Sequence, residues 1–275
     1  MKHQSKKRVI FTNIGIWLLF LIFIGFLSLF VEHLAEQCDY SIADLVSDGV
    51  HNIIMLILVL IYLLLIRSDT QKEIKTHLPP QKHLSFRFIP ILILLGLSYS
   101  MLSNSLLNMI HPLQNSLDRL GLTLSKGEFF SSFLTKMFSP INLSSTVLAC
   151  IIVPMYEELF FRGILLNRFK RAFSFTMSAF MSSLLFGLFH IAPHLMVNAF
   201  ITGMIFSWIY RKTGSLIAPV IVHGASNFMT DVMTNAYHHE ALYYTPVTIT
   251  ATIVFIACLA ALYLIFRKQE VPAHE

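Results

Sequence analysis

Long apolar runs dominate the sequence and predict helices that cross a membrane. A crossing helix needs roughly 17–25 mostly apolar residues. Seven runs without Asp, Glu, Lys or Arg meet or exceed that length: Val9–Val31, Gly49–Ile66, Phe88–Leu117, Met137–Tyr156, Ala172–Tyr210, Thr213–Thr230 and Ala241–Phe266. The fifth run is about twice as long as one crossing requires, and Pro193 breaks it. The pattern therefore predicts an all-α, polytopic membrane helix bundle of about eight transmembrane helices, in a single integral membrane domain spanning residues 1–275.

The distribution of basic residues predicts the orientation of these helices, because Lys and Arg in short loops stay on the cytoplasmic side. With the N-terminus inside, only Arg119, Lys126 and Lys136 fall on outer segments. Residues 32–48, an outer segment in this topology, contain acidic residues and no Lys or Arg. We therefore expect an integral protein of a bacterial cell membrane with both termini cytoplasmic. Labelling of an Asp44→Cys variant only from the cytoplasmic side would contradict this topology.

Composition supports a membrane protein and argues against a nucleic-acid partner. Hydrophobic residues make up 55% of the chain and charged residues 13%, with a mean hydropathy of +0.68, a balance unlike that of soluble globular proteins. The basic pI of about 9.1 follows from charges at helix ends, without an interleaved basic and aromatic surface. The cysteines are odd in number and widely spaced, so they predict no disulfide framework or cysteine metal site.

Three charged residues interrupt the apolar pattern near the end of the fourth run: Glu157, Glu158 and Arg162. Apolar residues continue to about Leu166, so the charges should lie inside one helix. A carboxylate at the bilayer centre costs about 2.5–3.5 kcal/mol, so it persists where it faces protein or a water-filled cavity. Glu158 and Arg162 are spaced i,i+4 and can pair, whereas Glu157 points about 100° away and is available for other work.

Two further polar pairs occur in apolar helices. Phe186 and His190 are four residues apart, which places an aromatic ring and an imidazole on one face. His223 and Asn227 have the same spacing, with small residues between them that would let a neighbouring helix approach closely. Together with the charged cluster, these helices could supply a carboxylate, two imidazoles and an amide to one buried site.

Each of these signals also has a purely structural interpretation. A lone histidine in a membrane helix is more often a packing hydrogen-bonder than a catalyst, a Glu–Arg pair is often a clamp, and Asn227 alone would be interhelical glue. We assign no chemical role to His51, His111 or His194. Counted from the helix ends, His190 and His223 would lie at different depths in the membrane, and an extension of the fifth helix over residues 168–176 would remove the difference.

The order and spacing of the three motifs resemble the CAAX proteases and bacteriocin-processing enzymes, a family of intramembrane proteases. The resemblance covers residues 145–230. The family motifs Glu-Glu-x-x-x-Arg, Phe-x-x-x-His and His-x-x-x-Asn are intact as Glu157-Glu158 with Arg162, Phe186 with His190, and His223 with Asn227. The resemblance implies a catalytic role for five residues and a structural supporting role for Arg162 and Phe186. The five catalytic residues are Glu157, Glu158, His190, His223 and Asn227.

Peptide hydrolysis needs an activated water, donors for the oxyanion and a proton for the leaving amine. Glu157 suits the general base, His190 can orient or help deprotonate the water, and His223 and Asn227 are donors on one face. Whether the site uses a metal cofactor stays open. Glu157, His190 and His223 could ligate Zn²⁺ with one open position, yet the sequence has no His-Glu-x-x-His motif and water activation by Glu and His needs no metal.

The resemblance implies an endopeptidase that cleaves a membrane-associated peptide or the tail of a lipid-anchored protein. A non-catalytic membrane-binding or bacteriocin-immunity protein of the same fold is an alternative that the sequence leaves open. A proton-coupled transporter would also use buried Glu and His residues, but it predicts inverted repeats and broken helices at matching positions, which we do not find. The expected partners are the membrane-anchored substrate and the lipid bilayer, with no nucleic acid.

Overall fold

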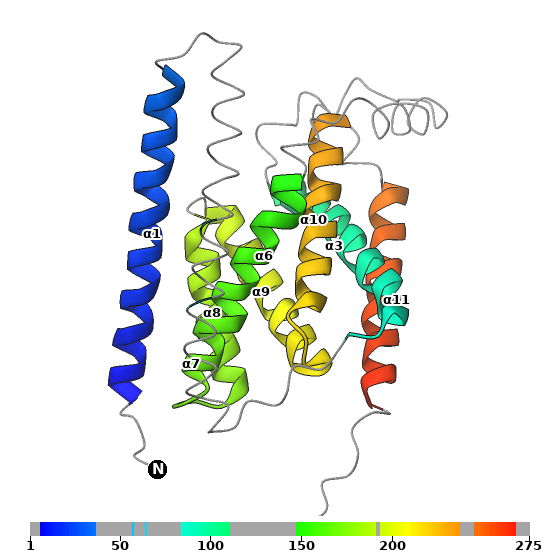
Figure 1. Ribbon diagram of the computed structural model, residues 1–275. Coiled ribbons are helices and arrows are strands. Elements are labelled where there is room, and N and C mark those ends of the chain that lie inside the picture. The colour runs from blue at the N-terminus through cyan, green and yellow to red at the C-terminus, as the bar shows by residue number, and fades with distance from the viewer. Residues whose placement is uncertain are drawn as a thin grey trace, which may run out of the picture. The chain divides into compact units, whose positions relative to one another are not determined.

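The structure, a computed structural model, describes residues 6–36, 57, 64, 84–110, 147–190, 193–236 and 245–267. No strand occurs among these residues, so the described chain is all-α, as the apolar runs predicted. The elements, shown in Figure 1, are α1 (Lys6–Glu36), η1 (Phe86–Phe88), α3 (Ile89–Ile110), η3 (Leu148–Ile152), α6 (Val153–Glu158), η4 (Leu159–Leu166), α7 (Asn167–Phe169), α8 (Phe175–Phe189), α9 (Pro193–Thr213), α10 (Ile217–Ala236) and α11 (Thr245–Arg267).

Most predicted spans coincide with observed helices. The long fifth run is divided into α8 and α9, and α9 begins at Pro193, where the break was expected. The second predicted span, at 49–66, lies outside the described residues apart from two helical positions. Two helices in the described chain are long and apolar enough to cross a membrane, Phe86–Ser105 and Pro246–Arg267, and Phe175–Phe189 is a shorter apolar helix. The count of eight transmembrane helices therefore stays a prediction.

The helix that carries the charged cluster continues beyond the end of its apolar run. Residues 148–169 are helical throughout, as η3, α6, η4 and α7, so the expected extension to about Leu166 is confirmed. Within this helix η3 and η4 are π-helical, with hydrogen bonds from i to i+5. Such segments are rare and occur frequently at functional sites.

The predicted extension of the fifth helix over residues 168–176 is wrong. Residues 170–173 form a turn, and α8 begins only at Phe175. Ser174 is its N-cap, with an extended ψ of 160° and a side chain that accepts a hydrogen bond from the Met177 amide at 3.4 Å. Because the N-cap residue has non-helical dihedrals, the helix cannot continue backwards through Ser174.

The chain divides into two compact units. Unit 1 comprises Met1–Lys82 and Ile152–Pro219, and unit 2 comprises His83–Ile151 and Val220–Glu275. Among the described residues, unit 1 contains α1, α6, η4, α7, α8 and α9. Unit 2 contains η1, α3, α11 and most of η3 and α10. A single integral membrane domain over residues 1–275 stays a prediction.

In unit 1, aromatic contacts and close helix packing surround the charged helix. Helix α8 packs along α9, where Gly187 lies so close that a Cβ would be 2.7 Å from the Met196 carbonyl oxygen. Phe20 of α1 stacks on Phe160 with ring centroids 4.2 Å apart. The indole of Trp17 donates a hydrogen bond to the Leu185 carbonyl oxygen at 3.1 Å. These contacts attach α1 to both η4 and α8.

In unit 2, glycines bring three helices into close contact. A Cβ on Gly96 of α3 would overlap the Val222 carbonyl oxygen of α10, and a Cβ on Gly224 of α10 would overlap the Cys150 carbonyl oxygen of η3. The hydroxyls of Ser100 and Thr230 also join α3 to α10 at 2.7 Å. Helix α10 is therefore held on two sides by backbone contacts that leave no room for a side chain.

We predict that Gly224→Ala lowers the melting temperature and the folded yield, because the new methyl group must displace the backbone at Cys150. Overpacking of this kind costs about 1–3 kcal/mol. The matched control is Gly15→Ala on α1, where nothing lies within 4 Å of a new Cβ, so the higher helix propensity of alanine should leave stability equal or greater. Thermal unfolding of both variants in the same detergent checks this. Equal melting temperatures would contradict the close packing of α10 on η3.

Candidate active site

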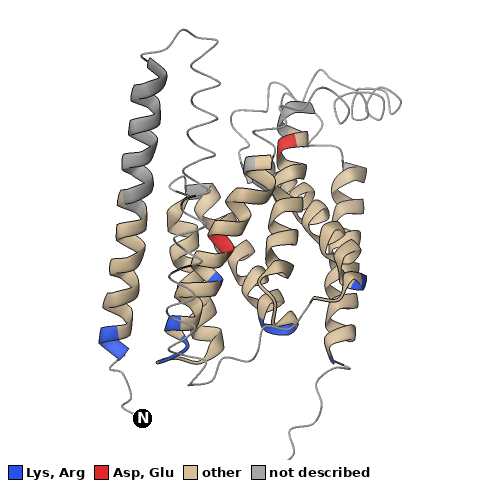
Figure 2. Cartoon of the chain, viewed as in Figure 1, with Lys and Arg blue, Asp and Glu red and all other residues tan. Residues whose placement is uncertain are grey.

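A buried cluster of charge lies inside unit 1, among otherwise apolar helices (Figure 2). Glu158 and Arg162 are completely buried, and Glu157 is 4% exposed. The predicted i,i+4 ion pair is present, with Nη1 of Arg162 at 2.9 Å from Oε1 of Glu158. Both charges are thus removed from solvent. Inside the protein their attraction is less screened than it would be at the surface.

Aromatic rings surround the guanidinium of Arg162. Its Cζ lies 4.6 Å from the ring centroid of Phe186 on α8 and 5.3 Å from that of Phe206 on α9. An aromatic face attracts a cation, and more strongly where the cation is desolvated. The support role expected for Phe186 therefore has a physical basis, and α8 and α9 together hold the side chain that neutralises Glu158.

Gly203 of α9 leaves the space that the guanidinium occupies. A Cβ at this position would lie 3.0 Å from Nη2 of Arg162 and 2.9 Å from Oγ of Ser183. Nη2 and Nε of Arg162 and the hydroxyl of Ser183 are all buried, and none of them has a hydrogen-bond partner among the residues that the structure describes. Buried polar groups of this kind are uncommon. The arrangement holds Arg162 by shape and charge more than by hydrogen bonding.

Side chains hydrogen-bond to three successive carbonyl oxygens in the π-helical segment η4. Ser182 of α8 donates to the Phe161 oxygen at 2.7 Å. The amide of Asn167 donates to the Arg162 oxygen at 3.0 Å and to the Gly163 oxygen at 2.9 Å. These bonds satisfy backbone acceptors in the widened turn and fix the helix directly after the two glutamates.

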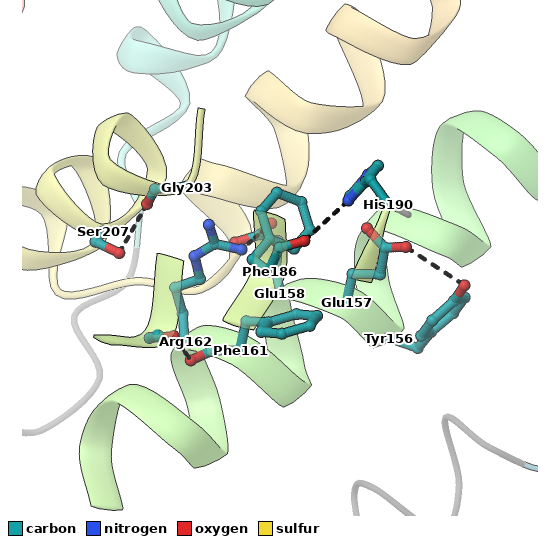
Figure 3. A network of polar contacts seen from close by, with 10 residues as sticks. Tyr156, Glu157, Glu158, Phe161, Arg162, Phe186, His190, Gly203 and Ser207 are labelled. Atoms are coloured by element: carbon teal, nitrogen blue, oxygen red, sulfur yellow. Dashed lines mark hydrogen bonds and ion pairs between the residues drawn. The ribbon is translucent and has the colours of Figure 1, made fainter. Parts of the chain in front are cut away.

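Glu157 projects away from the ion pair, as its position one residue before Glu158 predicted. In Figure 3 its carboxylate points toward the imidazole of His190. The hydroxyl of Tyr156 donates a long hydrogen bond of 3.5 Å to Oε1 of Glu157. Two carboxylates that are adjacent in sequence thus have different surroundings: Glu158 meets a cation, and Glu157 faces a phenol and an imidazole.

His190 follows the last residue of α8 and is fixed by a backbone hydrogen bond. Its Nδ1 lies 2.9 Å from the carbonyl oxygen of Phe186. A carbonyl oxygen can only accept, so Nδ1 carries a proton, and Nε2 of a neutral ring is the acceptor nitrogen. The Phe186 ring meets the imidazole edge to face at a centroid distance of 4.9 Å, which confirms that the two residues share one face.

The third motif lies on α10, in unit 2. His223 is 6% exposed, and Gly224 beside it contacts the backbone of η3, which confirms that a small residue here lets a neighbouring helix approach. The amide of Asn227 donates to the Ala149 carbonyl oxygen at 2.8 Å. Asn227 therefore joins α10 to η3, as expected if its role is to hold two helices together. That His223 and Asn227 join Glu157 and His190 in one site stays a prediction.

No group of three or more His, Cys, Asp or Glu side chains among the described residues is placed to hold a metal ion. The zinc ligand set that the sequence left open takes Glu157 and His190 from unit 1 and His223 from unit 2, so metal dependence stays a prediction. No step of the proposed mechanism is routed through a metal.

Several residues that support the charged cluster were not predicted from the sequence. Tyr156 and Asn167 lie on the charged helix itself and bond to Glu157 and to the Arg162 backbone. On α9, Gly203 makes room for the Arg162 guanidinium and Phe206 lies against it. Of these residues, Asn167 was the easiest to predict from the sequence. A polar residue directly after an apolar helical run is a candidate for hydrogen bonding to the last carbonyl groups of the helix. Gly203 and Phe206 carry no such signal, since glycine and phenylalanine are common in apolar helices.

The region that carries the motifs is similar to a known family. Residues 139–229 match the family model described as "Type II CAAX prenyl endopeptidase Rce1-like", which confirms over these residues the resemblance inferred from the motifs. A curated "Uncharacterized 24.3 kDa protein" of Escherichia coli is 33% identical over 104 residues, which cover 33% of this chain and 46% of that protein. The chain thus spans less than half of this relative's length. No solved structure matches the chain.

We predict that Arg162→Ala lowers both folded yield and melting temperature, because it leaves the Glu158 carboxylate buried without its cation. Removing one partner of a buried pair costs about 3–5 kcal/mol. The double variant Glu158→Leu/Arg162→Leu removes both charges, and we expect it to be more stable than Arg162→Ala. Thermal unfolding checks both. An unchanged melting temperature in Arg162→Ala, with activity lost, would mean instead that Arg162 contacts substrate.

Proposed function

We propose that the protein is an intramembrane endopeptidase that cleaves a membrane-associated peptide or the tail of a lipid-anchored protein. The family match covers all three motifs and describes a prenyl endopeptidase. The observation that supports the proposal is the position in unit 1 of a buried carboxylate, Glu157, and a backbone-fixed imidazole, His190, whose side chains point toward each other (Figure 3).

In the proposed mechanism Glu157 is the general base. A water held between the carboxylate and His190 loses a proton to Glu157 as its oxygen attacks the scissile carbonyl carbon. Tyr156 steadies one carboxylate oxygen through its hydroxyl. Glu158, in contrast, is neutralised by Arg162, and its role is to hold the helix in position. Different surroundings thus give two neighbouring glutamates different roles.

His190 orients the attacking water. The Nδ1 bond to the Phe186 carbonyl oxygen fixes both the tautomer and the ring plane, so Nε2 can accept a hydrogen bond from the water. Fixing the water in this way lowers the entropic part of the barrier. The proton taken by Glu157 then passes to the leaving amine, which completes hydrolysis.

For the tetrahedral intermediate, we propose that His223 and Asn227 are the oxyanion donors. This assignment rests on the third motif of the family and on the shared helix face of the two residues. The bond between the Asn227 amide and the Ala149 carbonyl oxygen uses one of the two amide hydrogens and fixes the group, so the second hydrogen remains for an oxyanion. Fixed donors lower the barrier more than mobile ones, because they need no reorganisation.

Glu157→Gln, His190→Ala and His223→Ala should each reduce cleavage to background while the protein stays folded. Gln keeps the shape of the side chain but cannot accept the proton, and loss of a general base alone typically costs about 10²–10⁴-fold in rate. The measurement is turnover of a reconstituted substrate that the wild type cuts, with the melting temperature as the check of folding. The control is His51→Ala, to which sequence analysis assigns no role. Near-normal turnover in all three variants would rule out the proposed protease mechanism.

Anchoring of the substrate should determine the cleavage rate. The proposed base lies inside apolar helices, so an extended segment already at the membrane reaches it at a higher effective concentration than a soluble one. We expect a lipid-anchored peptide to be cut at least about tenfold faster than the same scissile sequence without its anchor, since two-dimensional confinement replaces free diffusion. Both are compared in liposomes at matched total concentration. Equal rates would show that selectivity comes from the sequence alone.

A further inference from the structure

Basic residues lie together at one end of unit 1 (Figure 2). They come from the start of α1, from the segment that joins α7 to α8, and from the end of α9. We call this set the basic collar, and it consists of Lys6, Lys7, Arg8, Arg168, Lys170, Arg171, Arg211 and Lys212.

Side-chain contacts join these three segments. Lys6 lies over the ring of Phe173 at 5.7 Å from its centroid, and Arg211 lies over the ring of Phe175 at 4.7 Å. The two rings flank the turn before α8, so the cations of α1 and α9 are both held against this turn. Arg168 also donates from Nε to Oδ1 of the buried Asn13 on α1, at 3.1 Å.

Basic residues outnumber acidic ones in the described part of unit 1. The acidic residues there are Glu32 and Glu36, in the last turns of α1, and Glu157 and Glu158 inside α6. Glu158 is already paired with Arg162. Lys7, Arg8 and Arg211 are exposed. The collar therefore presents these three cations at the protein surface.

Apolar surface begins directly beyond the collar. On α1 the exposed Arg8 is followed by Phe11, which is 75% exposed, and by Leu19, which is 67% exposed. On α8 the turn is followed by Met177 and Phe180, which are 48% and 44% exposed. A ring of cations above an exposed apolar flank matches the boundary between headgroups and hydrocarbon in a bilayer.

We propose that the basic collar binds the phosphate headgroups of anionic phospholipids. Attraction of an anionic leaflet contributes about 1 kcal/mol per Lys or Arg near the surface, or about fivefold in the binding constant for each charge. Phosphate oxygens match the donors of Lys and Arg, and the apolar flank accepts the acyl chains of the same lipid. The collar thus selects anionic lipids from a mixed membrane, independently of whether the protein is a protease.

The chain carries its own reporters for a test. Its two tryptophans, Trp17 on α1 and Trp208 on α9, both lie in unit 1, on the helices that carry the ends of the collar. The full-length protein is reconstituted in phosphatidylcholine vesicles that contain either brominated phosphatidylglycerol or brominated phosphatidylcholine at the same mole fraction. Brominated chains quench tryptophan emission on contact. We expect phosphatidylglycerol to quench more at low salt and the difference to shrink in high salt.

The variant Lys7→Gln/Arg8→Gln/Arg211→Gln should lower the preference for phosphatidylglycerol at least about fivefold, because it removes three exposed charges of the collar. The matched control is Arg87→Gln/Arg267→Gln, which removes two exposed basic residues from helix ends of unit 2. Melting temperatures of both variants check that they are folded. Equal quenching by the two lipids in the wild type, or the same loss in the control, would overturn the proposal. So would abolition of the preference by millimolar inorganic phosphate, which would identify a site for free phosphate.

Discussion

The ion pair between Glu158 and Arg162 is the constraint on which much of unit 1 depends. Two full charges inside apolar helices are tolerable only when they meet each other and are closely enclosed. The enclosure comes from far along the chain: Phe186 on α8 and Phe206 on α9 cover the guanidinium, and Gly203 makes room for it. The close packing of α8 on α9 and the position of the charged helix are thus parts of one arrangement.

The same ion pair also gives the two neighbouring glutamates different roles, since Glu158 supports the structure and Glu157 is left for the proposed chemistry. Because Arg162 is occupied by Glu158, the neighbouring Glu157 is left to face Tyr156 and His190. His190 in turn is fixed through the carbonyl of Phe186, the same residue whose ring covers Arg162. The residue that stabilises the charge pair therefore also sets the tautomer of the imidazole, which couples the two halves of the proposed site in unit 1.

Sequence alone predicted the features that depend on spacing within one helix. The i,i+4 pairs Glu158–Arg162 and Phe186–His190 follow from helix geometry, and both are present. The continuation of the charged helix past Tyr156 was predicted for the same reason, from apolar residues that keep the helical pattern. The break at Pro193 follows from the chemistry of proline, which ends or kinks a helix.

Features that depend on other helices, or on a single capping side chain, were not predicted. Gly203 and Phe206 look ordinary in an apolar helix, and only the position of Arg162 gives them meaning. The predicted extension over residues 168–176 followed from the depth difference between His190 and His223, and it placed the start of α8 too early. Ser174, a serine directly before an apolar run, is the N-cap signal that would have placed the start correctly.

The π-helical segment η4 lets this helix tolerate a change in its number of residues. A π-turn accommodates one more residue than an α-turn, and in an α-helix each residue advances the helix by about 100° and 1.5 Å. Deleting one residue between Leu159 and Leu166 would let the segment close as an α-helix of nearly the same length. Residues after the deletion would keep roughly their orientation relative to the two glutamates, because the wider turn had absorbed the extra residue. Homologous sequences that differ by one residue in this segment could therefore still place the residues equivalent to Glu157 and Asn167 on similar faces of the helix.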